Sequence, residues 1–368
     1  MRRRAAALAV PFSAVLLAMS SCASIPEDWK TPAFLRSDSD QMDTRLPSVT
    51  GKVGEAPKVD FEGKAPPGEQ ISGVAKKGSG EGALIRNDDL LQVQMVDYQW
   101  TGKGKGEQKQ SSYERGAPVL LNLEEMSDDL RKNLVNQPVG SRVVFVFPGQ
   151  DPEEAKAMGQ PSPEPGDQVS IVDVEKRYGK GDIVDGEQTT DGGDGLPTVP
   201  DAGHGKPEIT IPEDTDPPKK LKTVDLIEGD GPEVTDEQQV VVQYTGAQWS
   251  DGKIFDSTWD KGGKPFTFAV GQGQVIKGWD QGLKGKKVGS RVMLVIPPDL
   301  AYGKDAPNGA PKGTLVFVVD ILGAVDSTPP PQADAGDGDK KDDKDAKKDD
   351  EKDSKNKDDE GKKDDGDK

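Results

Sequence analysis

Short runs of alternating apolar and polar residues dominate the pattern of the chain between residues 197 and 325. In each run the apolar side chains fall on every second position, which is the period of a β-strand. The clearest runs carry their apolar residues at Val240, Val242 and Tyr244, at Val292, Leu294 and Ile296, and at Leu315, Phe317 and Val319. This pattern predicts several antiparallel strands with one apolar face.

Only one segment of this region has helical spacing. Ile276, Trp279 and Leu283 fall at i, i+3 and i+7, and Gly282 or Gly285 is expected to end the helix. Because the sheet has no other cover, the helix must lie on its apolar face, with Trp279 pointing into the concavity. Strands around one short helix give an α+β fold class.

A self-comparison finds the same unit a second time, about 150 residues earlier in the chain. Residues 139–143 and 288–292 both read VGSRV, and residues 101–102 and 245–246 both read TG. Several matches in the same order indicate the duplication of one domain of ordinary size. The chain is therefore expected to contain two repeats of one sheet domain.

Domain boundaries follow from local composition. The two repeats are expected at residues 47–179 and 197–325, joined by a flexible Gly- and Asp-rich linker at residues 180–196. Residues 326–368 are Pro-rich and then almost only Asp, Lys, Glu and Gly, so they are expected to be a disordered tail. Lysines interrupt every acidic cluster of this tail and no EF-hand spacing is present, which argues against calcium binding.

The N-terminal segment has the features of an export signal. Residues 2–4 are three arginines, residues 5–19 are mainly apolar, and small residues precede Cys22. A weak membrane anchor and an ordinary cleaved signal are two interpretations. The third is that the segment resembles a bacterial lipobox, which implies a signal peptide at residues 1–21, lipidation of Cys22 and a tether at residues 22–46. The chain would then be anchored in the bacterial cell membrane on its extracytoplasmic face.

Composition and charge exclude several classes of function. The 368 residues carry a net charge of −18, which argues against nucleic acid as a partner and against a polybasic membrane patch. His204 is the only histidine and Cys22 the only cysteine, so a multi-His metal site, an intramolecular disulfide and a Cys cluster are excluded. No cofactor is expected, and any catalysis must proceed without these residues.

Six segments of the second repeat carry a resemblance to a known family. They read VVQYTG (241–246), DGKIFDS (251–257), PFTF (265–268), QVIKGW (274–279), AYG (301–303) and GTLVF (313–317). In this order, from Val224 to Leu322, the chain resembles the FK506-binding-protein type of peptidyl-prolyl cis-trans isomerase. The resemblance implies an antiparallel, five-stranded half-barrel wrapped around the short helix, once in each repeat, with a hydrophobic pocket for a proline ring.

The same resemblance implies the residues of the site. Trp279 is the floor of the pocket, Asp256 and Tyr302 are its polar edge, and the backbone N–H of Ile276 is a substrate donor. The walls are Tyr244, Phe255, Phe266, Val275, Ile276 and Phe317. Of these, Asp256, Tyr302, Phe255 and Trp279 are expected to be catalytic and the others to bind substrate. Isomerisation needs neither a nucleophile nor proton transfer, which suits a chain almost free of His and Cys.

Two regions depart from the family pattern. Residues 304–312 form a shorter loop with Gly309 and Ala310 where the family has a bulky aliphatic residue, which weakens one wall and the binding of macrolides. In the first repeat, Trp100 is assigned to the position of Tyr244 and Leu130 to that of Trp279. Nothing near residues 110–112 reproduces Phe255-Asp256, so the first repeat is expected to be inactive.

The leading function is therefore a peptidyl-prolyl isomerase that assists the folding of exported proteins. Its partners would be proline-containing exported polypeptides, macrolides of the FK506 type and the membrane, reached through the lipid. An alternative is a non-catalytic chaperone or assembly factor that grips proline-containing segments. A third reading is a surface scaffold whose tail or first domain recruits partners.

Overall fold

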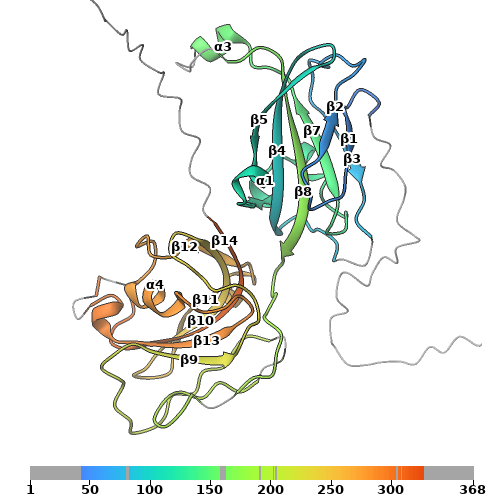
Figure 1. Cartoon of the computed structure of the whole chain (residues 1–368). Coiled ribbons are helices and arrows are strands. Elements are labelled where there is room, and N and C mark those ends of the chain that lie inside the picture. The colour runs from blue at the N-terminus through green and yellow to red at the C-terminus, as the bar shows by residue number, and fades with distance from the viewer. Residues whose placement is uncertain are drawn as a thin grey trace, which may run out of the picture. The chain divides into compact units, whose positions relative to one another are not determined.

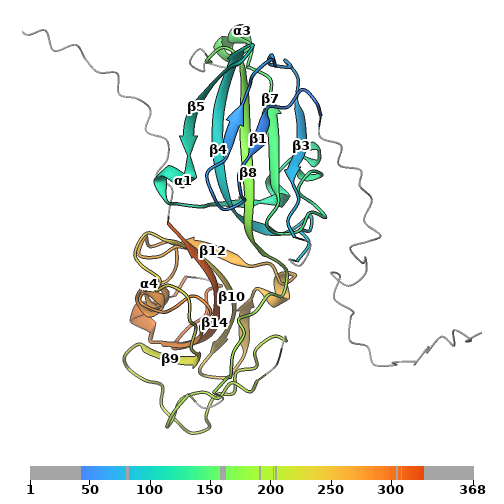
Figure 2. The ribbon, with the colours of Figure 1, turned by 45° about the vertical axis from the view of Figure 1, so that its right-hand side comes forward.

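A computed structural model of the chain describes residues 43–79, 83–157, 163–189, 192–201, 203, 205–303, 306–307 and 309–326. Within them, two antiparallel sheets account for most of the regular structure (Figures 1 and 2). The predicted α+β class is confirmed, because both sheets are antiparallel and the helices are few and short.

The first sheet has the strand order β3-β7-β8-β4-β5, and β6 also pairs with β4. Its strands are β3 (Ile71–Lys76), β4 (Leu90–Gly102), β5 (Lys105–Ser111), β6 (Val119–Asn122), β7 (Arg142–Phe147) and β8 (Asp167–Tyr178). The connecting helices are α1 (Ser112–Arg115), the 3-10 turn η3 (Leu123–Glu125), α2 (Asp128–Arg131) and α3 (Pro152–Ala157).

The second sheet has the order β9-β13-β14-β10-β11, and β12 also pairs with β10. Its strands are β9 (Lys222–Ile227), β10 (Gln239–Gln248), β11 (Ile254–Ser257), β12 (Phe266–Ala269), β13 (Arg291–Ile296) and β14 (Leu315–Val325). Its helices are α4 (Lys277–Leu283) and the 3-10 turns η4 (Trp259–Lys261) and η5 (Pro298–Leu300). Strand for strand, this is the pairing order of the first sheet.

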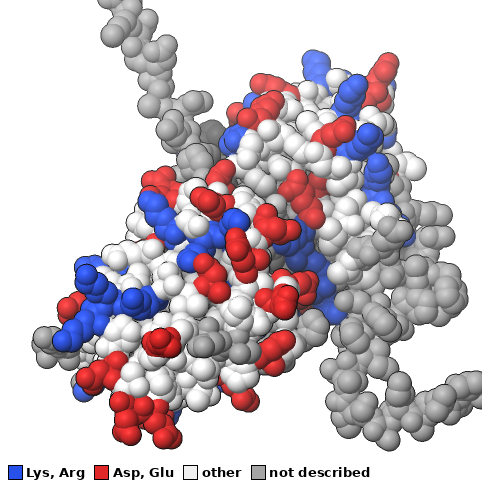
Figure 3. All heavy atoms as spheres, turned by 60° about the horizontal axis from the view of Figure 1, so that its bottom comes forward, with Lys and Arg blue, Asp and Glu red and all other residues white. Residues whose placement is uncertain are grey.

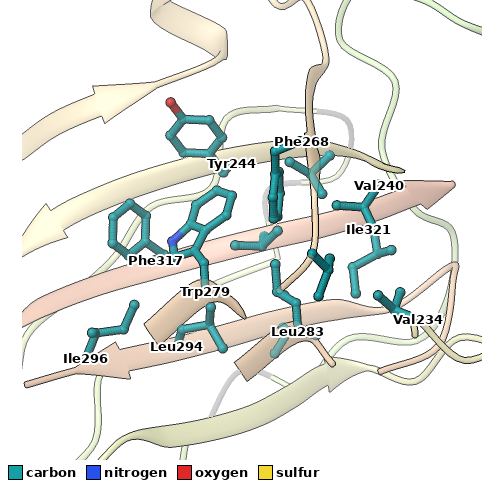
Figure 4. Packing of buried hydrophobic residues seen from close by; sticks show 14 of the residues in the cluster. Val234, Val240, Tyr244, Phe268, Trp279, Leu283, Leu294, Ile296, Phe317 and Ile321 are labelled. Carbon is teal, nitrogen blue, oxygen red and sulfur yellow. The ribbon is translucent and has the colours of Figure 1, made fainter. Parts of the chain in front are cut away.

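The inner face of the second sheet packs against α4, as the helical spacing predicts. Trp279 and Leu283 are 3% and 0% exposed and contact side chains of β10, β13 and β14 (Figure 4). Gly278 and Gly282 face this sheet closely: a Cβ on Gly278 would lie 2.4 Å from Ile296 Cγ2. The helix can therefore approach the sheet because two of its positions lack side chains.

Each sheet has a second, outer apolar face, and each outer face is covered by the chain that precedes it. In the first sheet the cover is a hairpin of β1 (Ser48–Thr50) and β2 (Lys58–Asp60). In the second it includes the fully buried Val199 and the partly buried Ile209 and Ile211, which pack on the outer residues of β13 and β14. Both sheets are therefore sandwiched between an inner helix and an outer cover.

A buried Arg–Asp pair ties each outer cover to its sheet. Arg142 meets Asp173 at two distances of 2.5 Å, and Arg291 meets Asp320 at 2.6 and 2.7 Å. The remaining donors of Arg142 reach backbone carbonyls around the β1–β2 hairpin, and Arg291 Nη1 donates to Gln188 Oε1 at 2.7 Å. The guanidinium donors that do not face the carboxylate are therefore hydrogen-bonded only while the cover is in place.

The described part of the predicted linker 180–196 lies packed on the second sheet. Val184 is 6% exposed, and the Thr189 N–H donates to the Leu226 carbonyl at 2.8 Å. The segment is rich in Gly and Asp, which suggests flexibility, but it also contains a few apolar residues, among them Val184 and Leu196, that pack in hydrophobic clusters. Likewise Leu46, at the end of the predicted tether, is fully buried.

The predicted signal peptide, Cys22 and nearly all of the predicted tail lie outside the described residues. Among the helices that the structure describes, none has the length and apolar character needed to cross a membrane. On the face shown in Figure 3, acidic and basic side chains are interspersed, so the net charge of −18 is not gathered there into one acidic patch.

Candidate active site

One cavity of the second sheet brings together all nine pocket residues predicted from the sequence. It measures about 290 Å³ and opens between β10, β11, β12, β14 and the N-terminal end of α4. Its lining consists of Tyr244, Phe255, Asp256, Lys261, Phe266, Gln274, Val275, Ile276, Trp279, Tyr302 and Phe317. The residues come from six separate segments, so the fold, not chain proximity, assembles the cavity.

The floor of the cavity is the indole of Trp279. Its ring centroid lies 5.1 Å from that of Tyr244 and 5.2 Å from that of Phe317, with interplanar angles of 87° and 89° (Figure 4). Edge-to-face contacts of this kind fix ring orientations more strictly than aliphatic packing does. The buried indole Nε1 has no hydrogen-bond partner among the described residues.

The walls are aromatic and one side of the cavity is open. Phe266 is 40% and Tyr302 41% exposed, the two large hydrophobic side chains that stand out as exposed in the described chain. Phe255 meets Phe317 edge-on at 5.5 Å. A Cβ on Gly246 would lie 2.7 Å from the Phe317 ring and 3.0 Å from that of Phe255, so only glycine there allows both walls.

The polar edge is built around the carboxylate of Asp256. Tyr244 Oη donates to Asp256 Oδ2 at 2.8 Å, and Lys261 Nζ lies 2.6 Å from Asp256 Oδ1. Burial, and after it the bond to Asp256, raises the pKa of the Tyr244 phenol, which therefore stays protonated and remains a donor. Both carboxylate oxygens are thus engaged within the protein.

Ile276 stands at the rim with its backbone free. It precedes α4 in an extended conformation, and its carbonyl accepts the N–H of Trp279 at 2.9 Å. Its own N–H makes no hydrogen bond within the described part of the chain. An unused donor beside an apolar cavity can bind a carbonyl of a ligand.

Two lining residues, Lys261 and Gln274, were missed by the sequence reasoning. Lys261 lies in η4, five positions after Asp256, and Gln274 directly precedes Val275. Each lies within or beside a segment that resembles the family, so its closeness in sequence to predicted pocket residues is the signal that could have identified it. Of the loop 304–312, residues 304, 305 and 308 lie outside the described chain.

The register of the first sheet corrects one assignment. Val143 and Val292 are equivalent in the VGSRV repeats and pair with Val172 and Val319. These pair in turn with Met95 and Tyr244, so Met95, not Trp100, holds the position of Tyr244. The shared TG dipeptide misaligned the strands by five residues, an odd number, which moves a side chain to the opposite face.

Trp100 instead matches Trp249, and both are buried under the outer covers. Leu130 does hold the position of Trp279. The Leu130 N–H donates to the Ser127 carbonyl, and the Trp279 N–H donates in the same way to the Ile276 carbonyl, at the start of each helix.

Among the described residues, no group of three or more His, Cys, Asp or Glu side chains is placed to hold a metal ion.

Comparisons with known proteins agree with this geometry. The model of the FKBP-type peptidyl-prolyl cis-trans isomerase family matches residues 231–322. An FK506-binding protein of Streptomyces anulatus is 47% identical over 120 residues, which are 32% of this chain and 95% of that protein. A probable FK506-binding protein of Corynebacterium glutamicum is 38% identical over 120 residues, 32% of this chain and 98% of the relative.

Two solved structures also match. The crystal structure of AtFKBP13 has 36% identity and a TM-score of 0.26, covering 28% of this chain and 91% of that one. The crystal structure of FkpA from Escherichia coli has 41% identity and a TM-score of 0.27, and the match covers 29% of this chain and 48% of that one. Because the chain spans nearly the full length of relatives that are 38% and 47% identical to it, it belongs to the FKBP-type peptidyl-prolyl cis-trans isomerase family.

Proposed function

We propose that the cavity floored by Trp279 isomerises X–Pro bonds of exported polypeptides and so assists their folding. The observation that carries the proposal is the convergence of six aromatic rings and one engaged carboxylate on a small, open hollow. A proline ring is apolar and rigid, so it fits such a cavity without demanding polar partners. Slow X–Pro exchange limits the folding of many chains, which gives the activity a use.

The mechanism follows from the physics of the amide bond. Resonance gives the C–N bond a rotation barrier of about 18–20 kcal/mol and places partial charge on the oxygen. Water favours this polar planar form, so a dry aromatic cavity favours the less polar, twisted amide. We expect the N–H of Ile276 and the hydroxyl of Tyr302 to hold substrate carbonyls, so that rotation occurs about one bond only.

Asp256 is expected to act through Tyr244. Its Oδ2 accepts a hydrogen bond from the Tyr244 hydroxyl and its Oδ1 forms an ion pair with the Lys261 ammonium, so the carboxylate is held away from a substrate carbonyl. Orientation of the Tyr244 ring, which contacts the Trp279 floor, is the role these bonds favour. If Asp256→Ala left turnover unchanged, Asp256 would have no place in the mechanism.

The experiment that tests the function is an isomerase assay with the full chain and a tetrapeptide containing a Leu-Pro bond. We expect acceleration, and a loss of about tenfold in kcat/KM for Phe266→Ala, because a wall of the pocket is removed. Phe266 is exposed enough for that variant to fold. Binding of the peptide without acceleration would instead identify a proline-binding chaperone or assembly factor, which is the second candidate. The exposed side chains of Phe266 and Tyr302 favour that candidate too, because they can contact a bound segment without catalysis.

We also propose that the chain acts at the outer side of a bacterial membrane, anchored through lipid on Cys22. The support is the sequence alone: arginines, an apolar stretch and small residues before the single cysteine. Two acyl chains give stable anchoring where one does not. Incorporation of labelled palmitate into the wild type but not into Cys22→Ser would support the proposal; equal labelling would refute it.

A further inference from the structure

Gln274 lines the cavity but takes no part in the mechanism described above. It lies in the turn between β12 and α4, directly before Val275 and Ile276, and its side chain is exposed. Among the lining residues, Asp256 and Lys261 bind each other, so neither offers an unengaged charge to a ligand. The side-chain amide of Gln274 is therefore the polar lining group whose use is still to be explained.

One atom of this amide is fixed by the backbone. Gln274 Oε1 accepts the N–H of Ala269 at 3.0 Å, at the end of β12. Since a backbone N–H can only donate, the oxygen of the amide must face it, and the orientation of the whole amide follows. The Nε2 group, with two donor hydrogens, is then directed away from Ala269, and among the described residues the side chain makes its one hydrogen bond through Oε1.

A substrate of this cavity brings the complementary groups. A proline ring has no hydrogen-bond acceptor, but the peptide on either side of it carries one carbonyl per residue. The cavity wall already offers donors at the Ile276 N–H and the Tyr302 hydroxyl. A third donor, oriented before the substrate arrives, can hold a further carbonyl at little entropic cost.

We propose that Gln274 Nε2 is a substrate-binding donor that donates a hydrogen bond to a backbone carbonyl of a residue flanking the proline. This inference rests on the proposed function, and it extends the site from a ring pocket to a subsite for an extended peptide. A neutral hydrogen bond of this kind contributes about 2- to 10-fold to binding. Because the bond forms with the ground state and the twisted state alike, its loss should raise KM and leave kcat nearly unchanged.

The competing interpretation is that Gln274 merely braces the turn through Ala269. Two variants of the full chain separate the roles. Gln274→Ala removes both the bracing oxygen and the donor, whereas Gln274→Glu keeps an oxygen for the Ala269 N–H and replaces only the donor. Gln238→Ala is the matched control, because Gln238 Oε1 braces another turn by accepting the Thr235 N–H at 2.9 Å, and Gln238 is not a cavity residue.

The measurement is KM and kcat for the Leu-Pro tetrapeptide, at low and high salt, together with the urea midpoint of each variant. We expect both Gln274 variants to raise KM by about 2- to 10-fold at both salt concentrations, while Gln238→Ala leaves KM unchanged. A Gln274→Glu variant with wild-type KM, or a change that disappears at high salt, would overturn the proposal. A Gln274→Ala variant with wild-type KM would also overturn it.

The two proposals can fail separately. If the wild-type chain bound the tetrapeptide without accelerating its isomerisation, the proposed catalysis would be wrong. Peptide affinity, measured by isothermal titration calorimetry, would still report on Gln274, with the same fold-changes expected in Kd. If the wild type is active but the Gln274 variants behave like Gln238→Ala, only the subsite is refuted.

Discussion

The two sheets share a frame but differ at the end of β10 where the cavity opens. Through the strand register, several positions in and beside the pocket of the second sheet can be matched to positions of the first. The replacements are Met95 for Tyr244, Asp97 for Gly246, Gln110 for Asp256, Val119 for Phe266 and Ser170 for Phe317. All three matched aromatic walls are absent from the first sheet.

A closed polar cluster takes the place of the open hollow. Asp97 is 5% exposed and accepts hydrogen bonds from Ser170 Oγ at 2.6 Å and from Gln110 Nε2 at 2.8 Å. The strand order, the Arg–Asp pair and the buried outer tryptophan are nevertheless the same in both sheets. The comparison teaches that the frame is stabilised from the outer face and the inner core, independently of the rings that make the site.

The largest expected effect comes from breaking the two Arg–Asp pairs one at a time. Asp320→Asn and Asp173→Asn each leave a buried guanidinium without its counter-charge, which costs about 3–5 kcal/mol. We expect Asp320→Asn to lose amide protection in β13 and β14 together with the isomerase activity. Asp173→Asn should lose protection in β7 and β8 and keep the activity. Hydrogen–deuterium exchange of the full chain, read peptide by peptide, measures both.

Each variant is the control of the other. Equal loss of protection in both sheets after either substitution would mean that the sheets unfold as one unit. It would then be wrong to treat the frame of the first sheet as separate from that of the second.

How much the sequence can predict differs between the two sheets for a physical reason. In the second sheet, aromatic and glycine positions occur in six segments, so β10, β11, β12 and β14 are each anchored by side chains that only one face can hold. In the first sheet, a TG dipeptide was used as the anchor, although Trp100 belongs under the outer cover. Register depends on hydrogen bonds to β8 and on the Arg142–Asp173 pair, which no local pattern contains.

The outer covers illustrate the same limit. The Gly- and Asp-rich composition of residues 180–196 predicts a flexible linker, and Pro, Asp and Gly remain frequent up to residue 216. Their role depends on contacts with distant partners, such as the bond from Trp249 Nε1 to the Thr215 carbonyl at 3.1 Å. The position of Lys261 in the cavity could not be predicted for a related reason, since its ion pair with Asp256 depends on the path of η4.

An intermediate effect is expected when the floor of the second sheet is replaced by the residue of the first. Trp279→Leu removes edge-to-face contacts with three rings, those of Tyr244, Phe266 and Phe317. A loss of about 2 kcal/mol in transition-state binding lowers kcat/KM about 30-fold. The tetrapeptide assay with the full chain measures it. The urea midpoint shows whether the fold survives the missing indole.

The reciprocal variant sharpens the result. Leu130→Trp places an indole in the first sheet without its aromatic walls, and we expect no gain in activity. Activity gained by Leu130→Trp, in a chain already carrying Trp279→Leu, would show that one floor residue suffices and that the walls matter less than the comparison implies.

The smallest expected effect concerns Asp97, the carboxylate that stands where the second sheet has Gly246. Burial raises the pKa of Asp97, and hydrogen bonds from Ser170 and Gln110 and the charge of Arg115 oppose the rise only in part. The folded chain therefore binds more protons than the unfolded chain between the ordinary value of 3.8 and the raised one. Stability of the first sheet should fall as the pH rises through that window and stay level above it.

Asp97→Asn removes the charge and keeps groups that can bond to Ser170 and Gln110. We expect it to stabilise the first sheet at pH 7, on the order of 1 kcal/mol, and to flatten the decline above pH 4. Hydrogen exchange of peptides from β4 and β8, taken across this pH range, follows the sheet directly. Because Gly246 cannot titrate, protection of β10 and β14 should be the same in both proteins at every pH. A variant that weakened β4 at pH 7 would mean that the ionised carboxylate, despite its burial, stabilises the polar cluster that replaces the pocket.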